Sequence, residues 1–534
     1  MYHNTEGSQN HAFGYEAMYW NTSGKYNVAV GYQSLAYNTT GNSNIAIGVQ
    51  SLRSNTEGTG NVAIGDSALS TNTINSNNVA IGFGALAAND ASANVAIGWK
   101  ALHSNTTGNS NTANGNSALF GNTTGFANTA NGNAALYSNK TGDSNTANGH
   151  RTLYSNTTGY NNSAIGAYAL YSNTTGKDNT ANGNEALYSN TIGNDNTAIG
   201  DEALYSNTTG LSNTANGSAA LYSNTTGAYN TANGISALHN NTSGNSNTAN
   251  GVSALYHNTS ADYNTAIGYG ALYSNTDGNS NIAIGYAALF FNTTGSNNTA
   301  NGYNALYDNT TGSNNTANGY SALSNNSGGS YNTALGYDAD VAATGLINST
   351  AIGNGAVVSV SNNMRFGNSS VIGWGFGVSP STRAIKVGAG ATNGNGAYLT
   401  VGGVWTDISD ASKKENITEL DKNLFLEKIQ QLKISKWMYT GTRDEYHIGP
   451  MAQEFHKLFE VGDDSSISSM DKTGVLFLGI QAIADEDLRL KTEDVRQNSE
   501  LENLKKENEN LKIKIANIKS EMISSQSSMN SGFT

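Results

Sequence analysis

The sequence predicts a mainly β protein in which a long β-solenoid or β-roll shaft precedes an α+β domain and a coiled coil. Three observations predict it: glycine returns every 17 residues, one leucine returns with the same period, and the composition changes sharply after Ile408. Repeats at a fixed period are typical of stacked arrays. The predicted parts are a shaft at 1–353, a β-rich neck at 354–408, a domain at 409–490, a coiled coil at 491–525 and a flexible tail at 526–534.

The composition favours an ordered chain and argues against several classes of protein. Only 12% of the 534 residues are charged, whereas 28 are tyrosine and 2 are proline; disordered tracts usually show the opposite balance. The net charge of −13 argues against a nucleic-acid partner, because such binding depends on basic surface. The chain has no cysteine, and we expect no metal and no cofactor. Without a run of 18 apolar residues, we expect no membrane insertion.

The first residues, Met1–Gly7, lead directly into the repeat and have neither a basic start nor an apolar core. They therefore do not resemble a Sec signal. This leaves unconventional export, release by lysis, delivery within a larger particle, or a fragment of a longer chain. We expect a baseplate or another anchoring protein to bind the N-terminus.

The 17-residue repeat carries one large aliphatic residue and two glycine-bearing turns per unit. One coil, from Gly82 to Gly98, is a residue short. Short alternating segments such as 61–65 (NVAIG) between turns favour a strand-turn-strand-turn coil. About 19 such coils at roughly 4.8 Å would give a shaft on the order of 90 Å. The leucine row includes Leu35, Leu52, Leu69, Leu86, Leu102, Leu119, Leu289, Leu306 and Leu323, with Met18 in the first coil.

One position in each repeat alternates between isoleucine and asparagine. It is Ile64, Ile81 and Ile97 in early coils, and Asn114, Asn131 and Asn148 in later ones. A position that accepts isoleucine is predicted to point inward, where asparagine would form a hydrogen-bonded ladder. Coordination of ions or small ligands by these amides is the alternative.

Two further rows follow the same period. Tyr137, Tyr154, Tyr171, Tyr188, Tyr205 and Tyr222 follow the leucines, with Phe120 and Phe290 as variants. Such an aromatic row fits ladder packing or a subunit interface, and sugar binding by stacking is the alternative. A threonine row (Thr112, Thr129, Thr146) also allows an ice-binding solenoid.

The repeats at about residues 1–350 resemble the head repeats of trimeric autotransporter adhesins. They are still more similar to the Asn-Thr-rich repeats that precede endosialidase-type chaperone domains in phage and bacterial surface fibres. The resemblance implies a fibre architecture and a homotrimer.

Two motifs in the C-terminal region carry a second resemblance. Residues 409–417 (SDASKKENI) and 447–455 (HIGPMAQEF) resemble the hallmarks of the intramolecular chaperone of endosialidase type, the peptidase S74 family. In the second motif the matching residues are Gly449, Ala452, Gln453 and Glu454, which we expect to hold the fold. Trp437 and Tyr439 fall where the family has the strand before its hairpin.

The family resemblance implies self-cleavage between Ile408 and Ser409, with Ser409 as nucleophile and Lys414 as base. A serine hydroxyl needs a base, and a lysine amine is a base only when its pKa is lowered. Asp410 is expected to orient Lys414. The enzyme would be a single-turnover Ser-Lys endopeptidase without an external substrate. Taken alone, Ser409-Asp410 also fits a helix N-cap. Residues 411–413 depart from the usual family pattern, which makes Ser412 and Lys413 alternates.

The last segment has apolar residues at alternating steps of three and four, which is typical of a coiled coil. Asn508 at one of these core positions fits control of register. The spacing allows dimers, trimers or tetramers, and the trimer follows only from the family resemblance. The core positions are Leu501, Leu504, Asn508, Leu511, Ile515, Ile518 and Met522.

These features predict a trimeric attachment fibre, either a phage tail fibre in the virion or a fibre on a bacterial surface. The fibre would bind a host or surface receptor, and a glycan is one candidate for this receptor. The alternatives are a trimeric autotransporter adhesin, a glycan-degrading tailspike and an ice-binding solenoid. The adhesin would need a C-terminal membrane barrel. A tailspike would need a carboxylate pair that stands out from the repeats, whereas Asp143, Asp178 and Glu185 are scattered.

Overall fold

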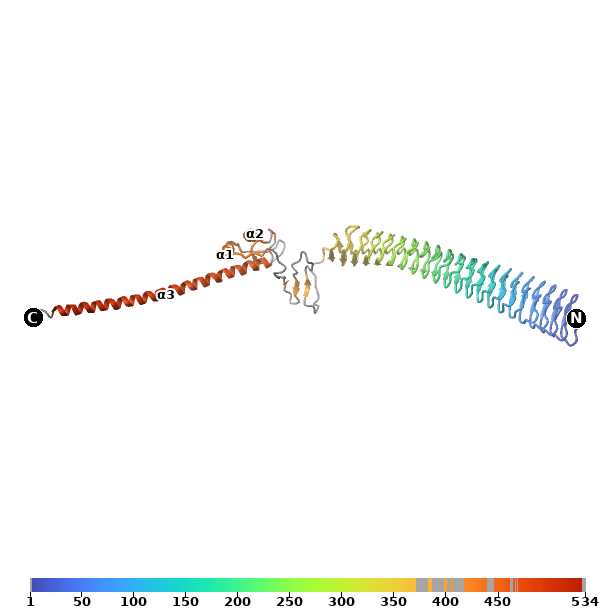
Figure 1. Ribbon diagram of the computed structural model, residues 1–534. Helices are drawn as coiled ribbons and strands as arrows, with labels where there is room; N and C mark the ends of the chain where they lie inside the picture. The colour runs from blue at the N-terminus through green and yellow to red at the C-terminus, as the bar shows by residue number, and fades with distance from the viewer. Residues whose placement is uncertain are drawn as a thin grey trace. The chain divides into compact units, whose positions relative to one another are not determined.

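A three-residue strand returns once per coil in the computed structural model, and these strands stack into one parallel sheet of 22 strands (Figure 1). Two units divide the chain, residues 1–373 and residues 374–534. The structure describes residues 2–370, 383–386, 398–400, 405–406, 417–438, 446–461, 464–465, 467 and 469–530.

The strands of the main sheet pair in register at a step of 17 residues, so that Ala130 lies opposite Ala147 and Ala147 opposite Ala164. The step is 16 residues at the short coil, from Val79 to Val95, and 14 at the last pairing, from Thr350 to Met364. They are β1 (His11–Phe13), β2 (Val28–Val30), β3 (Ile45–Ile47), β4 (Val62–Ile64), β5 (Val79–Ile81), β6 (Val95–Ile97), β7 (Thr112–Asn114), β8 (Thr129–Asn131), β9 (Thr146–Asn148), β10 (Ser163–Ile165), β11 (Thr180–Asn182), β12 (Thr197–Ile199), β13 (Thr214–Asn216), β14 (Thr231–Asn233), β15 (Thr248–Asn250), β16 (Thr265–Ile267), β17 (Ile282–Ile284), β18 (Thr299–Asn301), β19 (Thr316–Asn318), β20 (Thr333–Leu335), β22 (Thr350–Ile352) and β24 (Met364–Phe366).

Each coil forms one strand of the main sheet. The second strand predicted from the sequence is wrong except near the end of the shaft, where Asp340–Val341 pairs with Val357–Val358. The corresponding residues form turns because alternate residues have a left-handed backbone: in one coil Ala134 has φ 55° and Leu136 has φ 52°. This segment still bonds to the next coil, for example from the Leu136 amide to the Thr152 carbonyl at 2.9 Å. Stacking of coils was predicted correctly, but the local conformation was not.

The interior of the shaft is a row of leucines flanked by alanines, as the periodicity predicted. Leu136, Ala135 and the central strand residue Ala130 are fully buried. Every leucine of the row has a left-handed backbone, and so has Met18 with φ 47°. Left-handed conformations exclude β-branched residues far more strongly than leucine or methionine. This explains why the row contains leucine and methionine rather than isoleucine or valine.

A column of glycines closes the turn after each strand. Gly183 has φ 150°, and a Cβ at this position would collide with the carbonyl oxygen of Gly200 in the next coil. Both the backbone conformation and the close approach of coils therefore require glycine here.

Two rows of fully buried asparagines run along the shaft, and their side-chain amides link successive coils. In the first row, Asn139 donates from Nδ2 to Asn122 Oδ1 at 2.8 Å and to the Gly142 carbonyl at 2.8 Å. In the second, Asn145 donates its backbone N–H to Asn128 Oδ1 at 3.0 Å. An amide has donors and an acceptor, so identical side chains satisfy one another along a stack. These bonds add to the buried row of leucines and alanines in holding successive coils together.

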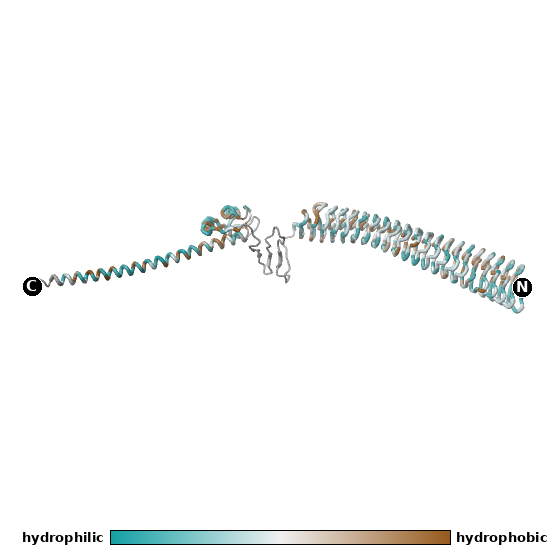
Figure 2. Tube along the Cα trace, in the orientation of Figure 1, coloured by the Kyte–Doolittle hydropathy of each residue, from teal (hydrophilic) through white to brown (hydrophobic). Residues whose placement is uncertain are grey.

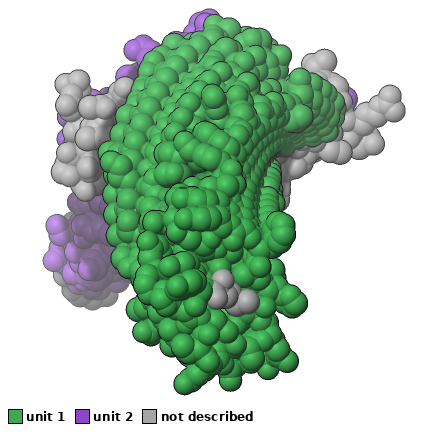
Figure 3. Space-filling view, turned by 90° about the vertical axis from the view of Figure 1, so that its right-hand side faces the viewer, with its two compact units in different colours: residues 1–373 green, residues 374–534 purple. Residues whose placement is uncertain are grey.

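The alternating Ile/Asn position points outward, and the prediction that it points inward is wrong. Ile64 and Ile97 are 36% and 38% exposed, and Asn114 and Asn148 are exposed as well. In a three-residue strand only the central side chain points to the interior, here an alanine. The buried ladders belong to two other asparagines of the repeat. Side chains of successive coils form continuous rows along unit 1 (Figure 3).

The short coil between Gly82 and Gly98 interrupts the first asparagine row. Asn89 donates to the Ala91 carbonyl at 2.6 Å, and Asn72 Oδ1 in the preceding coil is buried without a hydrogen bond from any residue that the structure describes. The lost residue thus costs the shaft one link of its ladder.

The C-terminal end of the shaft and unit 2 contain the strands and helices outside the main sheet. Near the end of the shaft, β21 (Asp340–Val341) pairs in parallel with β23 (Val357–Val358). Unit 2 contains an antiparallel sheet of β25 (Arg383–Lys386), β26 (Tyr398–Thr400) and β27 (Trp405–Thr406), the hairpin β28 (Ser435–Trp437) and β29 (His447–Gly449), and the helices α1 (Lys422–Gln431), α2 (Ala452–Phe459) and α3 (Ser469–Asn530).

Helix α3 has 62 residues, which gives a length of about 93 Å. Hydrophobic residues recur along α3 among hydrophilic ones (Figure 2). Among the described helices, none combines the length and the hydropathy needed to cross a membrane.

Candidate functional site

The residues predicted to cleave the chain lie in a segment that the structure does not describe. Ile408, Ser409, Asp410 and Lys414 are all outside the described residues, which resume at Ile417. The Ser-Lys pair therefore stays a prediction. The second motif, in contrast, can be placed on its structural elements.

The second motif spans a hairpin strand and the start of a helix. In the hairpin, Gly449 lies opposite Ser435 and His447 lies opposite Trp437, with the two rings 4.7 Å apart. Trp437 is thus on the strand before the hairpin, where the sequence predicted it. Tyr439 is outside the described residues.

Ala452, Gln453 and Glu454 form the first turn of α2. A carboxylate in this position is favoured by the partial positive charge of the helix N-terminus. The next turns bury Phe455 and Phe459, which are 2% and 4% exposed. The structure thus places these motif residues at the start of α2, and the expectation that they hold the fold stays a prediction.

The three helices of unit 2 share a small apolar core. Asp421 caps α1 by accepting hydrogen bonds from the amides of Asn423 and Leu424, at 2.9 and 3.3 Å. The rings of Phe425 in α1 and Phe459 in α2 lie 5.6 Å apart. Where α1 meets α3, a Cβ on Gly479 would lie 2.6 Å from Ile429 Cδ1, so glycine allows the close approach.

Comparison with known families agrees with this placement. The profile of the family described as chaperone of endosialidase, peptidase S74, matches residues 409–461. No match was found among curated proteins. A β-solenoid followed by this domain fits a fibre or tailspike-like protein. The chain carries a chaperone-of-endosialidase domain that begins at Ser409 and includes the hairpin and α2.

On the shaft, the aromatic row forms a continuous stack from His103 to Tyr307. Neighbouring rings are nearly parallel, as for Tyr188 and Tyr205, whose centroids are 5.1 Å apart at 6°. Each ring face inside the stack is therefore covered by the next ring, and only edges and hydroxyls remain accessible. This arrangement supports ladder packing and argues against sugar stacking on this row.

The threonine row lies on the outer face of the strands. Thr112 and Thr129 are partly exposed and flank the buried alanines, and Thr146 is exposed. The same face is aliphatic in the early coils, where Val30, Ile45 and Ile47 are 36–38% exposed. The strand face is thus aliphatic in the early coils and mixed further on, where isoleucines such as Ile165, Ile199 and Ile284 remain exposed between threonines and asparagines.

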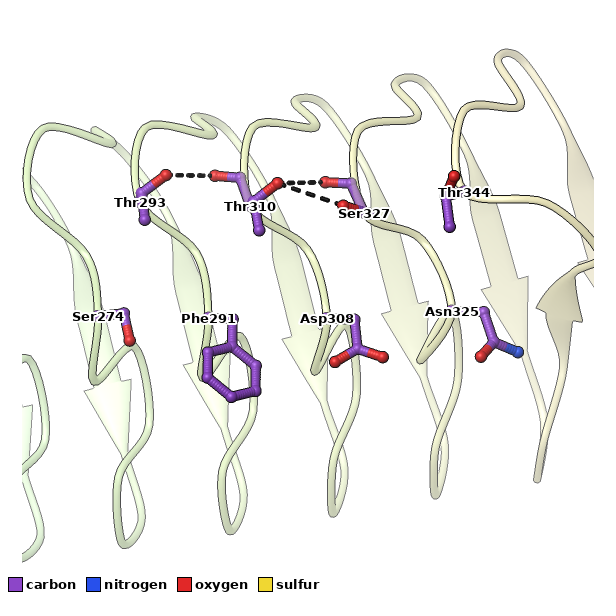
Figure 4. Close-up of a pocket in the computed structure, with 8 residues that line it drawn as sticks. All are labelled: Ser274, Phe291, Thr293, Asp308, Thr310, Asn325, Ser327 and Thr344. Atoms are coloured by element: carbon purple, nitrogen blue, oxygen red, sulfur yellow. Dashed lines mark hydrogen bonds between the residues drawn. The ribbon is translucent and has the colours of Figure 1, made fainter.

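A hollow of about 530 Å³ lies on the last coils of the shaft, on the turn segments rather than the strands (Figure 4). One row of its lining is Ser274, Phe291, Asp308 and Asn325. The second row is Thr293, Thr310, Ser327 and Thr344. The Thr293 hydroxyl donates to the Thr310 carbonyl at 3.0 Å, and the Thr310 hydroxyl donates to the Ser327 carbonyl at 3.1 Å.

A buried carboxylate fixes one side of this hollow. Asp340 accepts hydrogen bonds from the Ser324 hydroxyl at 3.1 Å, the Asn325 side chain at 2.9 Å and the Val341 amide at 2.7 Å. Burial raises the pKa of Asp340 above its usual value, although these hydrogen bonds partly offset the effect. The bond from Asn325 Nδ2 orients that amide and leaves its Oδ1 as an acceptor.

Sequence reasoning missed this hollow. Its signal is a departure from the repeat: the position held by Phe291 and Asp308 is serine in every coil from Ser138 to Ser223. It then becomes Asn240, His257, Ser274, Phe291, Asp308 and Asn325. Among the described residues there is no group of three or more His, Asp or Glu side chains that could hold a metal ion.

Proposed function

We propose that the protein is a trimeric attachment fibre of a phage tail or a bacterial surface, whose C-terminal domain directs trimer assembly and then cleaves the chain before Ser409. The observation that carries this proposal is the chaperone-of-endosialidase match, which starts at Ser409, C-terminal to a β-solenoid shaft. The shaft presents a receptor-binding surface, and a baseplate or anchoring protein holds its N-terminus.

Exposed apolar residues on α3 support association of chains. Leu504, Leu511 and Ile515 are 61%, 52% and 53% exposed, at the spacing of a coiled-coil core. Side chains of this kind are stable in water only when neighbouring helices cover them. A helix of this length also depends on such packing for most of its stability. The aliphatic strand face near Val30 and Ile47 is a second surface that further copies would cover.

The proposed cleavage needs only groups of this chain and water. Lys414, as a neutral amine, takes the proton of the Ser409 hydroxyl, and the oxygen attacks the Ile408 carbonyl carbon. The peptide bond breaks as the Ser409 nitrogen gains a proton, which leaves an ester between Ile408 and Ser409. Water then hydrolyses the ester to a carboxylate on Ile408 and restores the hydroxyl. A lysine is neutral near pH 7 only when its pKa is lowered, and burial upon assembly would lower it.

The experiment is a denaturing gel with intact mass spectrometry of the purified chain and of variants in the first motif. We expect the wild type to yield residues 1–408 and 409–534, because Ser409 supplies the nucleophile. Ser409→Ala and Lys414→Ala should stay full length. The matched controls Ser412→Ala and Lys413→Ala remove the neighbouring serine and lysine and should still be cut.

Two results would contradict the proposal. Cleavage of Ser409→Ala at the same bond would remove Ser409 from the mechanism. A wild type that stays uncut and elutes as a monomer would remove both cleavage and assembly. The variants are also measured by light scattering, since an uncut Ser409→Ala chain should still form trimers.

A further inference from the structure

The hollow near the end of the shaft combines an exposed aromatic ring outside the stacked ladder with a lining of hydrogen-bond acceptors. Phe291 is 41% exposed. Its ring stands at 81° to Phe290 and at 80° to Tyr307, at centroid distances of 4.9 and 5.1 Å. No other described ring stacks on it face to face, and its ring is seen face-on in Figure 4. The face of the Phe291 ring is therefore open as a platform for a ligand to stack on, whereas the faces of the ladder rings are covered by their neighbours.

Beside the platform, the hollow offers hydrogen-bond acceptors. The Asp308 side chain is exposed and makes no hydrogen bond or ion pair with any part of the chain that the structure describes. The hydroxyls of Thr293 and Thr310 already donate to backbone carbonyls, so their oxygens remain as acceptors. Asn325 donates to Asp340 and keeps Oδ1 free to accept. A ligand that fits must therefore donate hydrogen bonds along the shaft.

The charge of the hollow restricts the ligand further. Its lining contains one carboxylate and no lysine, arginine or histidine. Sialylated, sulfated or phosphorylated glycans would meet an uncompensated negative charge. A single cation would use Phe291 and Asp308 alone, whereas the acceptors extend over several coils. An extended ligand with an apolar face and many hydroxyl donors uses the entire hollow.

We infer that the hollow around Phe291 and Asp308 is a binding site for a neutral oligosaccharide, with one pyranose ring stacked on Phe291 and its hydroxyls donating to Asp308. Asn325 and the hydroxyl row of the hollow, Thr293, Thr310, Ser327 and Thr344, bind the adjoining sugars. This inference rests on the proposed function, since it places the receptor site of the fibre and the chemical class of the receptor.

The repeat itself supplies the variants for the test. Phe291→Ser and Asp308→Ser each restore the residue found at the same position in neighbouring coils such as the one with Ser274, so both variants are expected to fold. Phe126→Ser is the matched control, because Phe126 is 47% exposed on a coil far from the hollow. The full chain is titrated by calorimetry with neutral hexasaccharides of glucose, galactose, mannose and N-acetylglucosamine, and with a sialylated hexasaccharide.

We expect at least one neutral hexasaccharide to bind and the sialylated one not to bind. Phe291→Ser and Asp308→Ser should each weaken binding about tenfold or more, since one removes the platform and the other a charged hydrogen bond. Phe126→Ser should bind like the wild type. The site is overturned if no neutral hexasaccharide binds, or if Phe291→Ser binds as the wild type does. Binding of a lysine peptide at this site, abolished by salt, would overturn it in favour of a cationic ligand.

The same preparations separate this inference from the proposed function. Trimer formation and cleavage at Ser409 are measured on each one. A chain that assembles and cleaves but binds no neutral sugar loses only the site around Phe291. A chain that neither assembles nor cleaves contradicts the proposed function, whatever it binds.

Discussion

The shaft and helix α3 place the aliphatic residues of their regular rows in opposite ways. In the shaft, Leu136 and the other leucines of its row are fully buried within a single chain. On α3, in contrast, Leu504 and Ile518 are 61% and 56% exposed. The shaft thus completes its interior with its own coils, and α3 requires a partner to cover its apolar positions.

This difference indicates which region of the chain determines the association of subunits. Each coil of a solenoid contacts only its neighbours, so coils can stack in any single chain once one has formed. This stacking of coils does not determine how many chains associate. The coiled coil predicted for α3, however, would need helices of other chains, and its core positions would specify how many associate. Assembly of the proposed trimer should therefore depend on the C-terminal region, and the stability of the shaft should not.

The largest expected effect is the loss of association when charge enters the helical core. The double variant Leu504→Asp and Leu511→Asp places carboxylates at two core positions of each chain, where burial would cost several kcal/mol per charge. We expect the mass measured by light scattering to fall from a trimer to a monomer. The circular dichroism of the shaft should persist.

The control for this variant changes charge on the same helix without touching its core. The control is Lys505→Asp with Lys512→Asp. These two lysines lie next to the core positions, and their exposed ion pairs with Glu502 and Glu509 contribute little to stability. The control should keep the mass of the wild type. If the double core variant also keeps it, the chains do not associate through these positions of α3.

The sequence predicted the parts of the shaft that follow from period alone. The leucine row, the stacked coils and the aromatic ladder all require only that equivalent residues meet every 17 positions. It could not predict which asparagines are buried, because the direction of a side chain depends on local backbone angles. Left-handed residues such as Leu136 and Ala134 reverse the simple alternation expected of a strand. The Ile/Asn position was therefore assigned to the wrong side.

For the candidate sites, the limits are different. Gly449 and Glu454 could be named from the sequence because the motif covers a short stretch, which the structure places on one hairpin strand and one helix turn. Their role stays a prediction. The hollow depends on the contrast between Phe291 and the serines of other coils, together with the free carboxylate of Asp308. That contrast requires a comparison of the same position in all coils, together with a structure that places the Phe291 ring outside the aromatic ladder.

An intermediate effect tests why the shaft contains leucine rather than isoleucine. Leu187 is fully buried with φ 54°. Leu187→Met and Leu187→Ile conserve volume, but only isoleucine is β-branched and resists a left-handed backbone. We expect isoleucine to lower the free energy of unfolding by about 2 kcal/mol more than methionine. Equilibrium urea unfolding of the shaft, with hydrogen exchange of the neighbouring coils, measures the difference.

Met18 provides the internal precedent for this comparison, since it occupies the same position in the first coil with φ 47°. Equal losses for methionine and isoleucine would show that packing volume alone sets the row. Trimer mass should be unchanged in both variants, because the shaft does not decide association.

The smallest effect concerns the interrupted asparagine row, where the shaft can be improved rather than damaged. Inserting one threonine after Asp90 restores the 17-residue length of the short coil and allows Asn89 to reach Asn72 Oδ1. Regaining this buried hydrogen bond should stabilise the shaft by about 1 kcal/mol. The measurement is hydrogen exchange of the amides around Asn72 and Asn89.

The same insertion after Lys140 is the matched control, because that coil already has 17 residues and its ladder is intact. There the extra threonine should break a link and destabilise the coil. Opposite signs at the two places would establish that the asparagine row, and not the length of a loop, sets the register of stacking. If both insertions destabilise equally, the orphaned Asn72 oxygen is satisfied in solution, and the short coil is no weak point of the shaft.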